Sequence, residues 1–140
     1  MPTHYVHREG PVAAGDTRTA LTTQGAVAAP GTILVPPWAT KIKQLIVAVG
    51  DNTATAADGG HNFLVSLSGN GMKDGEQTVV VGGAFCDFTT AGDSGLRSHI
   101  HERLDVDMNV VPNGIVNIYA EATLGVLWGQ PEFGVTLGFA

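Results

Sequence analysis

The sequence predicts an all-β protein, an antiparallel β-sandwich of eight or nine short strands. Alternating apolar and polar stretches recur along the chain, Gly, Pro and Asn clusters separate them, and no segment carries a helical stripe that outcompetes the strand pattern. The 19 Gly and 7 Pro among 140 residues indicate many turns, because both residues disrupt helices. A chain of this length corresponds to one domain.

Residues 1–30 are rich in Ala, Gly, Thr and Pro and contain few large apolar side chains. We interpret them as an extended N-terminal arm with one or two short strands, around Tyr5-Val6 and Thr19-Leu21. Two roles stay open for this arm: a loose segment of its own subunit, or a segment that reaches onto a neighbouring subunit. Residues 31–140 then form the sandwich domain.

The first strands of the sandwich domain flank a proline pair. Residues 32–35 are β-rich and stop at Pro36-Pro37, since proline cannot continue a ladder. Residues 41–49 form the next strand, with a second half that is apolar on both faces. Strict alternation places Ile42, Gln44, Ile46 and Ala48 on one face, and Lys41, Lys43, Leu45, Val47 and Val49 on the other.

Three further stretches show the same period of two. Residues 63–67 place Phe63, Val65 and Leu67 on one face and precede the turn sequence Ser68-Gly69-Asn70-Gly71. Residues 78–81 follow as a strand, with a bulge or corner expected at Gly82-Gly83. Near the C-terminus, one apolar face holds Val135, Leu137 and Phe139.

The longest stretch without Gly or Pro, residues 96–111, tests the helix alternative. A helical stripe can be drawn, but a period of two collects the polar residues on one face far better, so a strand is predicted. Glu102 is the one misfit on the apolar face. The following Asn113-Gly114 indicates a hairpin connection, with residues 115–122 as the partner strand. One face of this partner strand holds Val116, Ile118, Ala120 and Ala122, and the other holds Asn117, Tyr119 and Glu121.

Composition excludes several function classes. The net charge is −6 with only seven Lys and Arg, so the chain lacks the cationic surface needed to bind nucleic acid or anionic lipid directly. No apolar run is long enough to span a membrane, and we expect no signal peptide. Cys86 is the single cysteine, which excludes an internal disulfide; we interpret it as a buried thiol.

His99 and His101 form the sharpest chemical motif. On a strand, residues two apart project from one face, and Asp105 falls on the same face, which gives a candidate metal site. The pattern resembles the first motif of cupins, but it has Asp where that motif has Glu, and no later strand supplies a third His. A solvated or subunit-facing polar strip is the stronger interpretation; a pH-dependent interface is a further alternative.

Trp38 and Trp128 offer a second candidate site. Each lies beside Pro or Gly near a strand end, where an indole can stack on a sugar ring. Packing at the core edge or anchoring an interface is the stronger interpretation, because aromatic residues make up only 6% of the chain.

A jelly roll and an immunoglobulin-like sandwich both fit this strand pattern; we favour the jelly roll, because the immunoglobulin-like core often carries two cysteines and this chain has one. Residues 33–37, 41–49, 63–69 and 75–83, with their turn placement, resemble small single-jelly-roll structural proteins of viruses. The resemblance spans about residues 31–140. It implies a coat or decoration subunit located in the virion, whose partners are copies of itself and other shell proteins.

We therefore expect a non-enzymatic, self-assembling structural subunit that needs no cofactor. The alternatives are a carbohydrate- or ligand-binding sandwich that uses Trp38 or Trp128, and a cupin-like metal-binding protein that uses His99, His101 and Asp105.

Overall fold

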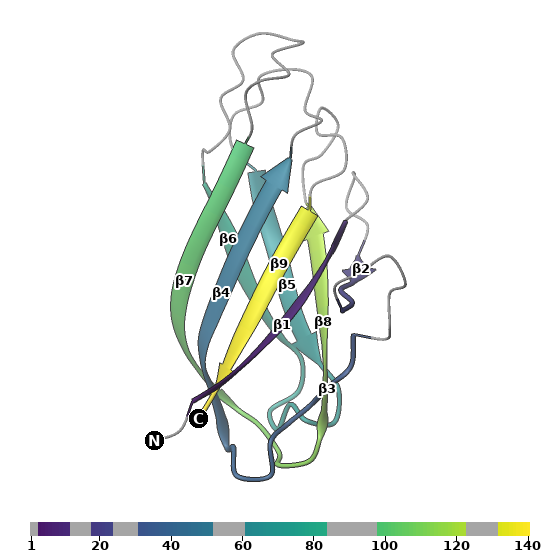
Figure 1. The fold of residues 1–140 in the computed structure, drawn as a ribbon, viewed down its shortest axis with the longest axis vertical. Helices are drawn as coiled ribbons and strands as arrows, with labels where there is room; N and C mark the ends of the chain where they lie inside the picture. The colour runs from purple at the N-terminus through teal and green to yellow at the C-terminus, as the bar shows by residue number, and fades with distance from the viewer. Residues whose placement is uncertain (1–2, 12–17, 24–30, 52–60, 84–97, 123–131) are drawn as a thin grey trace, which may run out of the picture.

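The chain folds into two antiparallel β-sheets packed face to face, which confirms the predicted β-sandwich (Figure 1). The computed structural model describes residues 3–11, 18–23, 31–51, 61–83, 98–122 and 132–140. Its strands are β1 (His4–Pro11), β2 (Thr19–Ala20), β3 (Ile33–Leu34), β4 (Lys41–Asp51), β5 (His61–Ser68), β6 (Gln77–Gly83), β7 (Ser98–Asn109), β8 (Ile115–Ala122) and β9 (Glu132–Phe139). No helix lies in these residues.

Sheet A has the strand order β1-β9-β4-β7, and sheet B has the order β2-β8-β5-β6, with β3 also paired to β8. Figure 1 shows sheet A in front of sheet B, with β1 and β2 on one side of the sandwich and β6 and β7 on the other. Strands adjacent in sequence often lie in different sheets, so most pairings join distant parts of the chain.

The core lies between the sheets and is built, apart from Ile42, from the apolar faces that the period of two predicts. In sheet A these faces hold Ile42, Leu45, Val47, Val49, Phe133, Val135, Leu137 and Phe139; in sheet B they hold Phe63, Val65, Leu67, Val81, Val116, Ile118 and Ala120. The rings of Phe63 and Phe133 meet edge to face across the two sheets, with centroids 5.3 Å apart. Each face therefore interlocks with the opposite one.

In β4 the predicted faces are wrong at one end. In the pairing with β9, Ile42 lies opposite Phe139 and Gln44 lies opposite Gly138, so Lys43 is an extra residue in β4. Ile42 therefore joins Leu45 on the buried face, and Lys43 is exposed. A bulge of this kind places two consecutive residues on the same side of a strand. The alternation predicted from the sequence holds only after Gln44.

The predicted hairpin between β7 and β8 is also wrong, although the turn itself is correct. Asn113 has the expected positive φ of 64°, but β7 pairs with β4 in sheet A and β8 pairs with β5 in sheet B. Residues 110–114 thus carry the chain from one sheet to the other. Most of their backbone hydrogen bonds go to residues 35, 40 and 71, and within the segment Gly114 donates to the carbonyl of Val111 at 3.0 Å.

The described parts of the N-terminal 30 residues lie in the sandwich of their own chain. β1 pairs with β9 over its full length, from His4 opposite Phe139 to Pro11 opposite Glu132. Leu21 follows β2 and is 1% exposed in the core. These residues contribute to both sheets, whatever role the remaining part of the predicted arm has.

Candidate interaction surfaces

One end of the sandwich gathers most of the large apolar side chains that the described residues expose. Of the six such side chains, four belong to this end: Leu34 (63% exposed), Trp38 (46%), Val111 (39%) and Ile115 (40%). Leu34 and Ile115 are directly opposite each other in the pairing of β3 with β8. We call these four residues the apolar end patch.

The backbone beneath the apolar end patch is held by hydrogen bonds between three turns. Val35 donates to the carbonyl of Gly114 at 2.9 Å and accepts from the amide of Asn113 at 3.0 Å. Val111 donates to the carbonyl of Gly71 at 2.8 Å. A Cβ atom on Gly114 would lie 2.5 Å from the Cα of Gly71, so only glycine permits this approach. A patch on such a frame loses little conformational entropy when it binds.

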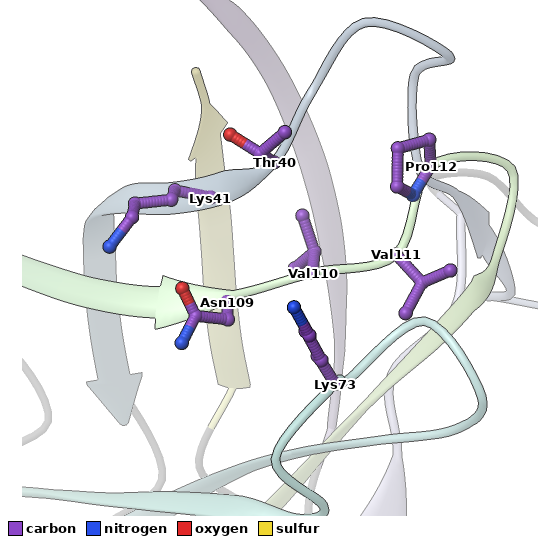
Figure 2. A pocket seen from close by; sticks show the side chains of 7 residues that line it. All are labelled: Thr40, Lys41, Lys73, Asn109, Val110, Val111 and Pro112. Carbon is purple, nitrogen blue, oxygen red and sulfur yellow. The ribbon is translucent and has the colours of Figure 1, made fainter.

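A small hollow lies beside the patch, with a volume of about 290 Å³. Figure 2 shows its lining residues, which are Thr40, Lys41, Lys73, Asn109, Val110, Val111 and Pro112. The Lys73 ammonium has no ion pair or side-chain hydrogen bond with any described residue, whereas Asn109 donates to Asp74 at 2.8 Å. The hollow is at the lower limit of size for small-molecule sites and combines one unpaired cation with an apolar wall.

The outer face of sheet A carries a polar network instead of an apolar patch. Tyr5 on β1 donates to the Oε1 atom of Gln44 on β4 at 2.8 Å, and Arg103 on β7 reaches the same oxygen at 3.3 Å. The Tyr5 ring lies over Gly138 of β9, where a Cβ atom would come within 3.0 Å of it. The Tyr5 side chain of β1 thus crosses β9 to reach β4.

Asp107 is the one described carboxyl group with a clearly shifted pKa. The ammonium groups of Lys43 and Lys41 lie 2.8 and 2.9 Å from its Oδ1 atom. The hydrogen bond from Lys43, followed by that from Lys41, lowers the pKa of Asp107 from 3.8 to about 2. Lys41 and Lys43 share a face by ordinary alternation, and the β4 bulge places this face on the outside of the sheet, opposite to the buried face of Leu45.

The predicted metal ligands all lie on β7, in regular register with β4: His99 opposite Gly50, His101 opposite Ala48, and Asp105, which is exposed, opposite Gln44. An extended strand rises about 3.3 Å per residue, so Asp105 lies roughly 13 Å along the strand from His101. Asp105 is therefore a poor third ligand for a metal held by the histidines. The two imidazoles fall outside the described side chains, so the site stays a prediction.

Within the described residues, no three His, Cys, Asp or Glu side chains gather closely enough to hold a metal ion. Of the predicted sugar-stacking residues, Trp38 is half exposed in the turn between β3 and β4, and Trp128 lies outside the described residues. The same holds for Cys86. No described helix has the length and hydropathy to cross a membrane.

Comparison with known proteins adds no relative to this picture. No protein-family model matches the chain, and no curated protein matches it.

Sequence reasoning missed three members of the apolar end patch. Leu34, Val111 and Ile115 each lie in a β-rich run, where an apolar residue ordinarily indicates a core position. Their exposure depends on which strands pair and where each sheet ends, and no local pattern encodes that. The proline pair at Pro36-Pro37 was the available signal, since it marks the chain's passage around this end.

Proposed function

We propose that this chain is a non-enzymatic structural subunit that assembles with copies of itself into a protein shell of the viral coat or decoration type. The apolar end patch carries the proposal. Leu34, Trp38, Val111 and Ile115 are 39–63% exposed on a backbone held by hydrogen bonds. Exposed apolar groups clustered on a rigid frame are typical of protein interaction sites.

The strand order supports the jelly-roll part of this proposal. Both β2 and β3 pair with β8, so they count as two pieces of one strand. The eight resulting strands then pair in a nested way: first with last (β1–β9), second with seventh (β2/β3–β8), third with sixth (β4–β7) and fourth with fifth (β5–β6). Folding such a nested ribbon over itself is what produces a jelly roll.

The charge supports self-assembly over genome binding. With a net charge of −6, this chain contacts other shell proteins or copies of itself more readily than it contacts phosphate backbones. A location in the virion is implied by the resemblance of residues 31–140 to small single-jelly-roll structural proteins of viruses, and it is part of this proposal.

Light scattering coupled to size exclusion tests the proposal. We expect a native mass several times the 14.5 kDa of one chain, and we expect Leu34→Asp combined with Ile115→Asp to reduce it, because a buried carboxylate without a partner is costly. Ala20→Asp, an exposed position on β2, is the matched control and leaves the mass unchanged. A wild-type chain that stays monomeric at high concentration would contradict the proposal.

Trp38 supports a second candidate function, binding of a carbohydrate. Its indole is 46% exposed in a turn and offers a stacking face. Glycan binding by the wild-type protein that disappears in Trp38→Ala, with an unchanged native mass, would favour this function over assembly.

A further inference from the structure

Four strand edges border the two sheets, and each edge presents backbone amides and carbonyls that can pair with another chain. β1 and β7 are the outer strands of sheet A. In sheet B, β6 is the outer strand on one side, and β2 and β3, which both pair with β8, are the outer strands on the other. Natural proteins protect such edges with very short strands, charged side chains, prolines or covering segments. Three of the four edges here carry such a device.

The edge strands β1, β2 and β3 meet on one side of the sandwich, which we call the closed side. Glu9 and Thr22 exchange two backbone hydrogen bonds of 2.8 Å across it. The Arg8 guanidinium adds bonds to the carbonyls of Gly31 at 3.0 Å and Thr32 at 3.3 Å. β2 and β3 have only two residues each, and β1 ends in Pro11. β2 and β3 therefore leave only short edges, and the second edge of β1 is paired at Glu9 with the chain's own backbone.

β6 and β7 border the opposite side, which we call the open side. Along the described lengths of these two strands, no backbone hydrogen bond joins one to the other. β7 is protected by charge on both faces: Glu102 points inward and is half buried, while Arg103, Asp105 and Asp107 are exposed on the outer face. An inward-pointing charge is an effective block to strand addition, because pairing would desolvate it.

Within the part of the chain that the structure describes, β6 has none of these devices. It runs from Gln77 to Gly83 without a charged residue or a proline, and it pairs with β5 in unbroken register. Thr78 is exposed and Val80 is 58% exposed on its outer face. The described residues place no strand against its second edge. A regular, neutral, β-branched edge is the type that accepts an added strand.

We propose that the free edge of β6 pairs antiparallel with β6 of a second copy of this chain, about a two-fold axis at Val80, so that two copies of sheet B form one continuous sheet. This inference rests on the proposed self-assembly and names one contact within it. Val80 is the middle of the seven residues of β6. In this pairing the Val80 residues of the two copies would lie directly opposite each other, which is a favourable β-branched pair, and Val79 of each copy would lie opposite Val81 of the other.

Charge favours a second copy as the occupant of this edge. The net charge of −6 opposes contact between copies in general, but β6 brings no charged side chain to this contact. A strand edge alone buries less than the roughly 1,200 Å² of a stable pairwise interface. The contact therefore gains strength only when other contacts, such as the apolar end patch, hold the same copies together.

A site-directed disulfide tests this pairing. In a Cys86→Ser background, Val80→Cys leaves one thiol at the proposed axis. Directly opposed residues of antiparallel strands have Cα atoms about 4.5–5.5 Å apart, within disulfide range. We expect mild oxidation to convert assembled protein to a covalent dimer. Thr78→Cys is the matched control: its two copies would lie about 13 Å apart along the strands and should remain unlinked.

Val80→Lys and Val80→Thr give a second test that does not depend on Cys86. Lysine on the edge should prevent pairing and lower the native mass, whereas threonine keeps a neutral β-branched edge and should leave the mass unchanged. Efficient cross-linking of the Val80→Cys variant, together with mass loss only in the lysine variant, supports the proposal. Assembled Val80→Cys protein that forms no cross-link, or a native mass unaffected by lysine, overturns it and leaves self-assembly standing. A wild-type monomer overturns both.

Discussion

Glu9 and Thr22 exchange two backbone hydrogen bonds across the closed side of the sandwich, whereas none joins the described lengths of β6 and β7 across the open side. The difference extends to the side chains. Leu21 on the closed side is 1% exposed, while Leu104 on β7 is only half buried against the core. The closed side thus joins the two sheets of the single chain, whereas on the open side the described residues leave the outer edge of β6 unpaired.

The largest effect should come from a methyl group placed on the closed side. A Cβ atom on Gly31 would lie 1.8 Å from the carbonyl oxygen of Leu21, so Gly31→Ala must move the backbone. We expect a loss of about 3 kcal/mol or more in the free energy of unfolding, or no stable fold. Gly75→Ala, with open space around the position but a φ of +84°, should cost only about 1–2 kcal/mol. Urea denaturation compares the two; equal losses would contradict the account.

Matched leucine truncations should separate the two sides next. Leu21→Ala should lower the free energy of unfolding by about 2–5 kcal/mol, because it opens a cavity in the closed side. Leu104→Ala should lower it by less, about 1–2 kcal/mol, because that side chain is only partly buried against the core. Denaturation at a concentration where the protein is monomeric measures both. A larger loss for Leu104 would mean that the open side is also sealed in the single chain.

Arg8→Met should cost about 1–3 kcal/mol, because it removes the donors to the carbonyls of Gly31 and Thr32. Arg8→Lys keeps the charge but loses the planar fork of donors, so it should recover only part of the loss. Thermal unfolding of the three proteins decides this. Full recovery by lysine would show that charge, and not the paired donors, closes this side.

Glu102→Val should change assembly more than stability. It removes the inward-pointing charge that protects β7 and gives the open side a second neutral edge position. We expect a shift to larger species in light scattering, with unfolding changed by less than about 1 kcal/mol. Glu121→Val, a half-buried carboxylate on the inner strand β8, is the control. If both variants enlarge the species equally, edge protection by Glu102 is not the cause.

The smallest effect concerns Asp107 on β7. Its folded-state pKa of about 2 lies below the ordinary 3.8, so ionised Asp107 stabilises the fold above about pH 3.8, and this contribution is lost as the pH falls toward 2. The carboxyl group is largely exposed, so the contribution to stability is small. A carboxyl-carbon NMR titration should show the low midpoint, and Lys43→Met should raise it. A midpoint near 3.8 in the wild-type protein would contradict the pairing.

Local patterns predicted the strands and most of their buried faces. Phe63, Val65 and Leu67 are buried as their alternation indicates, and residues 98–109 form a strand despite the helical alternative. Glu102, the misfit in that alternation, does point inward from an edge strand. A period of two encodes which side of a strand is apolar, so these features were accessible from sequence.

The pairing of distant strands and the bulge in β4 could not be predicted from local patterns. Nothing near Asn113 reveals that β7 and β8 belong to different sheets, and nothing near Lys43 reveals the bulge that reverses the face of Ile42. The exposure of Leu34 and Val80 follows from where each strand lies in its sheet. The interaction surfaces depend on topology, and a single sequence carries only weak information about topology.

Amide hydrogen exchange, followed by mass spectrometry at low and high protein concentration, tests most directly that the open side mediates assembly through β6. The account predicts that peptides covering Gln77–Gly83 become more protected as the concentration rises, while peptides covering residues 102–109 of β7 and residues 4–11 of β1 change little. Protection that does not depend on concentration in β6, or that rises equally in β7, would contradict it.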